Sequence, residues 1–190
     1  IISDFIDLQV IPQKHPIPDK ENIIFPRYHQ LDTVLKLTLA TKQNGTGTNY
    51  LIQHSTGSGK SNTIAWLAYK LLRLFDNNNN TVFDGVIILS DRVGIVNQLG
   101  NTVEQFEQTA GTAETMSKSK HLAKNLETKR KILTTTQQKF PFVLDYISKV
   151  KGSHYALIID EAHSSQSPES RKKIQKVLAT NLEQAEKEEQ

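Results

Sequence analysis

The chain has 190 residues, of which 37% are hydrophobic and 23% are charged, and its formal net charge is +3. This length suffices for one domain with a sizeable core, and the composition is that of an ordinary soluble globular protein. The absence of cysteine excludes a disulfide scaffold and a thiolate metal site, and no apolar run reaches membrane-spanning length. These features fit a cytoplasmic protein. The mild positive charge permits nucleic-acid binding but does not indicate it.

Residues 1–25 combine short apolar pairs with three prolines, at positions 12, 16 and 18. They are expected to form a strand remnant and a linker that enters from an upstream domain. The chain does not begin with methionine and stops inside a helix-like run, so we expect it to be a fragment of a larger protein.

Strand-like and helix-like segments alternate along the rest of the chain. Continuous apolar runs, which are typical of strands covered on both faces, lie at 50–52, 86–89, 131–135 and 155–159. Helical spacing of apolar residues is found at 31–41, 64–75, 94–106, 119–128 and 142–149. This repeated β-α order predicts a parallel sheet with helices on both sides and with ligands at the carboxyl ends of the strands.

The segment HSTGSGKS, from His54 to Ser61, follows the first of these strands and precedes a helix. A strand-turn-helix of this kind directs backbone N–H groups and the positive end of the helix dipole at one point, which favours an anion. Lys60 can reach the β- and γ-phosphates of a nucleotide, and the Ser61 hydroxyl can bind Mg²⁺. His54 departs from the usual pattern, which begins with glycine. The residues expected to bind the phosphates are Thr56, Gly57, Ser58, Gly59, Lys60 and Ser61. The alternative interpretation is a simple glycine-serine turn.

A second motif, DEAH, follows the last predicted strand. Asp160 lies where it can bind the same Mg²⁺ as Ser61, and Glu161 can orient or activate an attacking water. Strands often end in acidic residues, so this motif is informative only together with the upstream loop. His163 is expected to relay the state of the nucleotide; the alternative is an ordinary helix-start residue.

The sequences TGSGKS and DEAH together resemble motifs I and II of superfamily 2 helicases and translocases. Further segments resemble the R subunit of type I restriction-modification enzymes: RYHQ at 27–30, SDR at 90–92, TTTQQKF at 134–140 and DEAHSSQ at 160–166. The resemblance implies an α/β fold, the three-layer RecA-like lobe of a P-loop NTPase with a mainly parallel sheet. It also implies ATP and Mg²⁺ as cofactors. The activity implied for the whole protein is translocation of double-stranded DNA, followed by cleavage in another domain, with methyltransferase and specificity subunits as partners.

The resemblance also assigns residues. Gln30 would recognise the adenine edge, although a solvent-facing helix residue is an equal alternative. Arg92, Thr134 and Thr135 would contact the backbone of one DNA strand, while an internal ion pair is an equal alternative for Arg92. A basic run between 118 and 131 is expected to be a solvated face rather than a phosphate-binding patch. The sequence departs from the pattern of this family at two places, VGIV at 93–96 and Ser164 in place of arginine. These departures make the subfamilies harder to distinguish.

We therefore expect a linker at 1–25, a first RecA-like motor lobe at 26–167 and a C-terminal helix at 168–190 that leads towards a second lobe. That second lobe would supply an arginine to the site, so the segment alone is expected to bind ATP with little turnover. One alternative is another superfamily 2 motor, such as a type III restriction subunit or a repair helicase. The other is a non-catalytic nucleotide-gated module, which the intact Lys60, Asp160 and Glu161 disfavour.

Overall fold

The computed structural model describes residues 7–11, 20–106, 112–115, 131–140, 143 and 154–162. Four strands form its main sheet: β3 (Gly85–Ser90), β4 (Ala113–Thr115), β5 (Lys131–Thr136) and β6 (Tyr155–Ile159). Their order is β4-β5-β3-β6, and every pairing is parallel. The α/β fold with a parallel sheet, predicted from the β-α order, is therefore confirmed.

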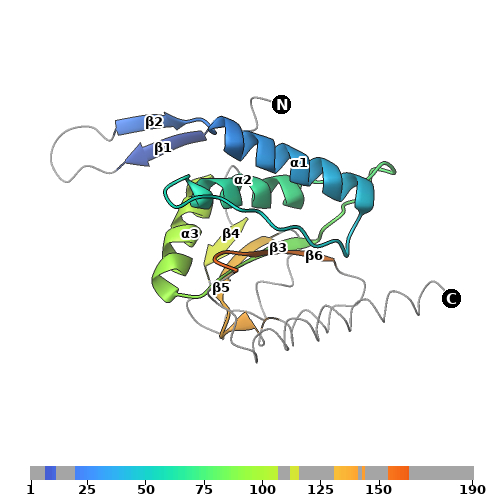
Figure 1. The fold of residues 1–190 in the computed structure, drawn as a ribbon. Coiled ribbons are helices and arrows are strands. Elements are labelled where there is room, and N and C mark those ends of the chain that lie inside the picture. The colour runs from blue at the N-terminus through green and yellow to red at the C-terminus, as the bar shows by residue number, and fades with distance from the viewer. Residues whose placement is uncertain are drawn as a thin grey trace.

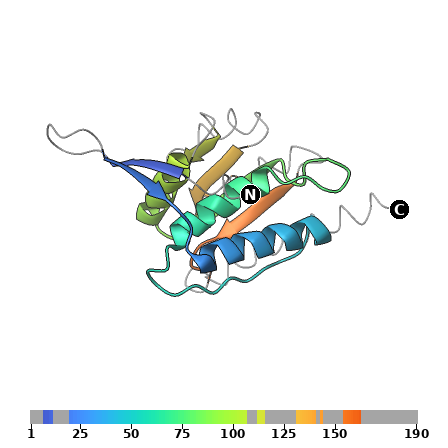
Figure 2. The same cartoon turned by 90° about the horizontal axis from the view of Figure 1, so that it is seen from above.

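Three helices accompany the sheet: α1 (Tyr28–Asn44), α2 (Lys60–Leu72) and α3 (Val93–Gln105). In Figure 1, α1 and α2 lie on the same side of the sheet, and α2 is the nearer of the two. Figure 2, turned by 90°, shows α1 running alongside α2. All three helices lie close to their predicted positions. The helices predicted at 119–128 and 142–149 lie outside the described residues.

Alternate residues of β3 belong to two different hydrophobic clusters, because successive side chains of a strand point to opposite faces of the sheet. Val86 and Ile88 join the cluster beneath α2 and α3, where Trp66 and Phe106 meet edge to face at 5.3 Å. Ile87 and Leu89 join a second cluster on the opposite face. All six residues of β3 are buried, as expected for a strand covered on both faces.

The strand predicted at 50–52 is absent, and this prediction was wrong. The chain between α1 and α2 is irregular here, and Leu51 is 90% exposed. A short apolar run needs a neighbouring strand to satisfy its backbone groups. Within the described part of the chain, β6 is paired through β3 alone, and no strand pairs with 50–52.

The N-terminal region also differs from the expectation of a strand remnant and linker. β1 (Asp7–Ile11) and β2 (Lys20–Ile24) form a separate two-stranded antiparallel sheet, and β2 leads into α1 (Figure 1).

Among the described residues, no helix is both long and apolar enough to cross a membrane.

Candidate active site

The turn before α2 has the backbone geometry of an anion-binding loop. Gly57 and Gly59 have φ angles of 76° and 83°, in the left-handed region that favours glycine. Gly59 is the N-cap of α2, and no side chain caps the helix. The first N–H groups of a helix have no partner within the helix itself, so this uncapped end is available to an anion. We call residues 54–59 the phosphate loop.

Lys60 and Glu161 come together at the carboxyl end of the sheet. Lys60 Nζ lies 3.4 Å from Glu161 Oε1, and the two side chains are about one-third exposed, at 33% and 30%. The first residue of α2 and the turn after β6 supply the two groups. The predicted convergence of the phosphate loop with the DEAH motif is thus present in the geometry, while the catalytic roles of these residues stay predictions.

Asp160 is fixed at the same edge by its backbone. Its N–H donates to the carbonyl of Leu89 at 2.8 Å, which extends the pairing of β6 with β3 by one residue. Burial raises the pKa of the Asp160 carboxyl above its usual value, and repulsion from Glu161 adds to the rise. A backbone hydrogen bond from Glu161 and the charge of Lys60 act in the opposite direction.

The oxygen donors at this edge suit Mg²⁺. Asp160 offers a half-buried carboxylate whose charged form is disfavoured until a cation compensates it, and Ser61 offers a hydroxyl in the first turn of α2. Within the described ranges, no group of three or more His, Cys, Asp or Glu side chains forms a metal site. A magnesium ion held by one carboxylate and one hydroxyl, with phosphates and water completing its shell, matches this donor set.

Gln30 is buried, with 4% of its surface exposed, so the alternative of a solvent-facing residue was wrong. Its Oε1 accepts a hydrogen bond from the Arg27 N–H at 2.8 Å, and its Nε2 donates to the Gly59 carbonyl at 2.9 Å. The neighbouring His29 contacts the Ser58 carbonyl at 3.0 Å through Nε2. Two consecutive residues of α1 therefore bind two consecutive carbonyls of the phosphate loop. Sequence reasoning missed this, and the adenine contact of Gln30 stays a prediction.

The proposed DNA-contacting residues divide into two groups. Arg92 is exposed at the N-terminus of α3. Thr134 and Thr135 are 1% and 0% exposed within β5, so the described conformation gives neither hydroxyl access to a DNA strand. Both lie in a strand covered on its two faces, which leaves its side chains in the core. His163 lies outside the described residues.

The motif segments meet at the end of β3. The N–H of Gln137, just after β5, donates to the Ser90 carbonyl at 3.1 Å, and Asp160 is bonded to Leu89, one residue earlier. The ends of three neighbouring strands are thereby connected at a single edge of the sheet. This is where ligands bind in open parallel sheets.

The carboxyl edge of the parallel sheet carries a glycine-containing loop that leads into an uncapped helix, together with a lysine and two carboxylates. This combination defines a P-loop nucleotide-binding lobe. Comparison with protein families agrees with this class. The SWI2/SNF2 ATPase family matches residues 29–184, and the chain belongs to this family. It is thus a superfamily 2 helicase-like motor lobe, an ATPase domain of a kind that uses nucleotide and usually Mg²⁺. No curated protein matches the chain.

Proposed function

We propose that the chain is the first RecA-like motor lobe of the R subunit of a type I restriction enzyme. In this proposal it drives ATP-dependent translocation of double-stranded DNA that precedes cleavage by another domain. The observation that carries the motor function is the contact of Lys60 with Glu161 at the carboxyl edge of a parallel sheet. The restriction-enzyme assignment is supported by the segments RYHQ, SDR, TTTQQKF and DEAHSSQ.

The arrangement gives each residue a task in ATP hydrolysis. Lys60 would stabilise negative charge on the β- and γ-phosphates, and Ser61 and Asp160 would hold Mg²⁺, which supplies further charge stabilisation. Glu161 would orient the water for in-line attack. Lys60 and Glu161 partly neutralise each other. Binding of phosphates would draw Lys60 away, and the Glu161 carboxylate would then accept a hydrogen bond from water.

The partners that this proposal requires are double-stranded DNA and the methyltransferase and specificity subunits. Arg92 is the candidate for a DNA-backbone contact because it is exposed at the start of α3. A second motor lobe would supply the arginine that completes the site. Without it, the lobe is expected to bind ATP and hydrolyse it slowly.

The match to SWI2/SNF2 ATPases favours a second candidate, which is another superfamily 2 motor on double-stranded DNA. A type III restriction subunit is one example. Such a motor would use the same residues for ATP hydrolysis but would not need type I methyltransferase and specificity subunits.

Measurement of ATP consumption on linear DNAs of increasing length separates these candidates. The intact protein would be assayed with and without the methyltransferase and specificity subunits. The proposal predicts that ATP use per DNA molecule rises with DNA length and requires both partner subunits. If ATP use by the protein alone rises with DNA length, the second candidate is favoured. If the rate of ATP use does not depend on added DNA, both candidates are contradicted.

A further inference from the structure

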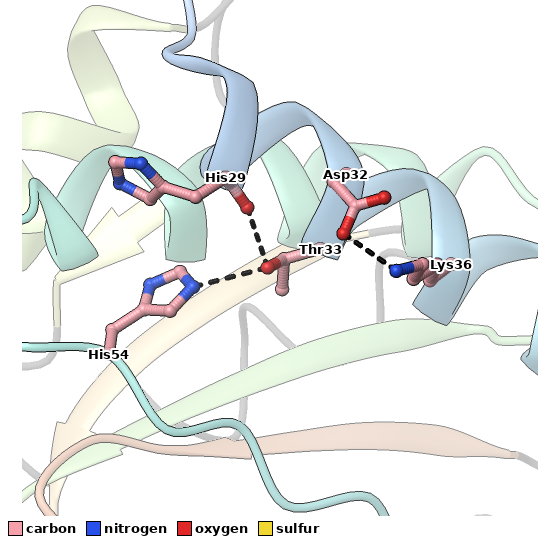
Figure 3. Close-up of polar contacts among 5 residues, drawn as sticks. All are labelled: His29, Asp32, Thr33, Lys36 and His54. Carbon is pink, nitrogen blue, oxygen red and sulfur yellow. Dashed lines mark hydrogen bonds and ion pairs between the residues drawn. The ribbon is translucent and has the colours of Figure 1, made fainter.

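Three side chains connect α1 to the beginning of the phosphate loop (Figure 3). Thr33 Oγ1 donates to the carbonyl of His29 at 2.7 Å and lies 3.1 Å from Nε2 of His54. The rings of His29 and His54 meet edge to face, with their centroids 5.4 Å apart. His54 is the residue that occupies the usual glycine position at the start of the phosphate-binding pattern.

The chemistry of the partners fixes the donor in each contact. The single hydroxyl hydrogen of Thr33 is directed at the His29 carbonyl, so Thr33 Oγ1 accepts from His54, and His54 carries its hydrogen on Nε2. His29 likewise donates from Nε2, because the Ser58 carbonyl is only an acceptor. Both bonds therefore depend on an imidazole N–H.

These contacts hold the phosphate loop at both ends. His54, its first residue, is bonded to Thr33, while Ser58 and Gly59, its last residues, are bonded to His29 and Gln30. All the partners lie in the first turns of α1. The residues between the two ends, 55–57, are exposed. His54 does not have a positive φ, so glycine is not required at this position.

We propose that Thr33 and His54 are positioning residues of the nucleotide site, and that their hydrogen bond holds the phosphate loop in its ligand-binding shape before ATP arrives. This inference rests on the ATPase function proposed above. A loop that is already ordered loses less conformational freedom when it binds a ligand. Neither residue is assigned a contact with the reacting atoms, so the bond affects KM for ATP rather than kcat.

The test compares hydroxyl variants of α1 in the intact protein. Thr33→Val removes the hydroxyl with little change in shape, and Thr33→Ser restores it. Thr38→Val is a matched control, because Thr38, five residues further along the same helix, donates from Oγ1 to the Val34 carbonyl at 2.7 Å in the same way that Thr33 bonds His29. We expect KM for ATP to rise about three- to tenfold in Thr33→Val, the range for loss of one hydrogen bond. Thr33→Ser and Thr38→Val should keep the wild-type KM, and kcat should change less than twofold or so in all three.

His54→Phe provides a second and independent variant, because it keeps an aromatic ring beside His29 but has no N–H. It should raise KM as Thr33→Val does, and the double variant should be no worse than either single one, because both remove the same bond. Equal KM values for Thr33→Val and Thr38→Val, or additive effects in the double variant, would overturn the inference. A wild-type protein that binds no ATP would instead refute the proposed function.

Discussion

The Glu161 carboxylate lies 3.4 Å from the Lys60 ammonium, on a residue whose backbone has a φ angle of 53°. A positive φ is uncommon for residues other than glycine and costs of order 1–3 kcal/mol. The strained turn after β6 thus coincides with the residue that would orient water. Such strain concentrates at functional sites, where the surrounding structure maintains it.

Replacement of Glu161 by glutamine should separate ATP binding from hydrolysis. Glu161→Gln keeps the shape of the side chain but removes the charge that pairs with Lys60, so Lys60 is more available to phosphates. We expect ATP to bind at least as tightly as in the wild type and to be hydrolysed about 10²- to 10⁴-fold more slowly. Equilibrium binding of a fluorescent ATP analogue and single-turnover hydrolysis would measure the two effects.

Glu104→Gln is the matched control for this experiment. Glu104 lies in α3 and is exposed, and its Oε1 accepts a long hydrogen bond of 3.4 Å from Thr115 Oγ1. Its replacement should change neither binding nor hydrolysis. A Glu161→Gln variant that hydrolyses ATP as fast as this control would exclude Glu161 as the residue that orients water.

Gly59→Ala should destabilise the protein. Gly59 has a φ angle of 83°, and an added Cβ would lie 2.5 Å from Nε2 of Gln30. The Gln30 side chain is held in place by two hydrogen bonds, one at Oε1 and one at Nε2. We expect a loss of about 2–4 kcal/mol from left-handed strain and disturbed hydrogen bonds. Urea unfolding would measure the free-energy change.

The control is Gly94→Ala in α3, where an added Cβ meets no atom within 4 Å and φ is not positive. Alanine is the better helix former by up to about 1 kcal/mol, so this variant should be neutral or slightly stabilised. Equal unfolding midpoints for the two variants would show that the described loop geometry is wrong.

The stability of the protein should depend on the titration of His54. Burial lowers the pKa of His54 below its usual value of 6.5, and the nearby His29 and Lys60 lower it further. The folded state therefore favours the neutral ring, while the unfolded chain takes up a proton more readily. The stability that this preference contributes is complete above the unfolded pKa and is lost as the pH falls through it towards the folded pKa.

His54→Gln retains an N–H donor but does not titrate, so it isolates this contribution. As the pH falls from about 7.5 to about 5.5, the urea midpoint of the wild type should fall more than that of His54→Gln, because the pH range spans the usual histidine pKa. A constant difference between the two proteins across this range would show that the pKa of His54 is not lowered.

Local patterns were sufficient to predict most of the described elements. The apolar run at 86–89 indicates a buried strand, and the periodic apolar residues of α2 indicate a helix with one buried face. These two element types could therefore be predicted from the sequence. The run at 50–52 has a similar composition but lacks a neighbouring strand in the described structure. The short β4 strand and the β1–β2 sheet were missed for the same reason, since pairing depends on a partner elsewhere in the chain.

The meeting of Lys60 with Glu161 could be anticipated because parallel strands bring their carboxyl ends to one edge of the sheet. The role of α1 could not. The contacts of His29 and Gln30 with the carbonyls of Ser58 and Gly59 depend on how closely α1 approaches the phosphate loop. No local pattern reports that distance.

Equilibrium binding of ATP in the presence of Mg²⁺ to Lys60→Ala is the most direct test of the nucleotide site. Lys36→Ala is the control, because Lys36 is 75% exposed on α1 and pairs with Asp32 at 2.8 Å, within the same helix. We predict about 10- to 100-fold weaker binding for Lys60→Ala, as expected for loss of one charged hydrogen bond, and wild-type affinity for Lys36→Ala. Equal affinity of Lys60→Ala and the wild type would contradict the assignment of this edge of the sheet as an ATP site.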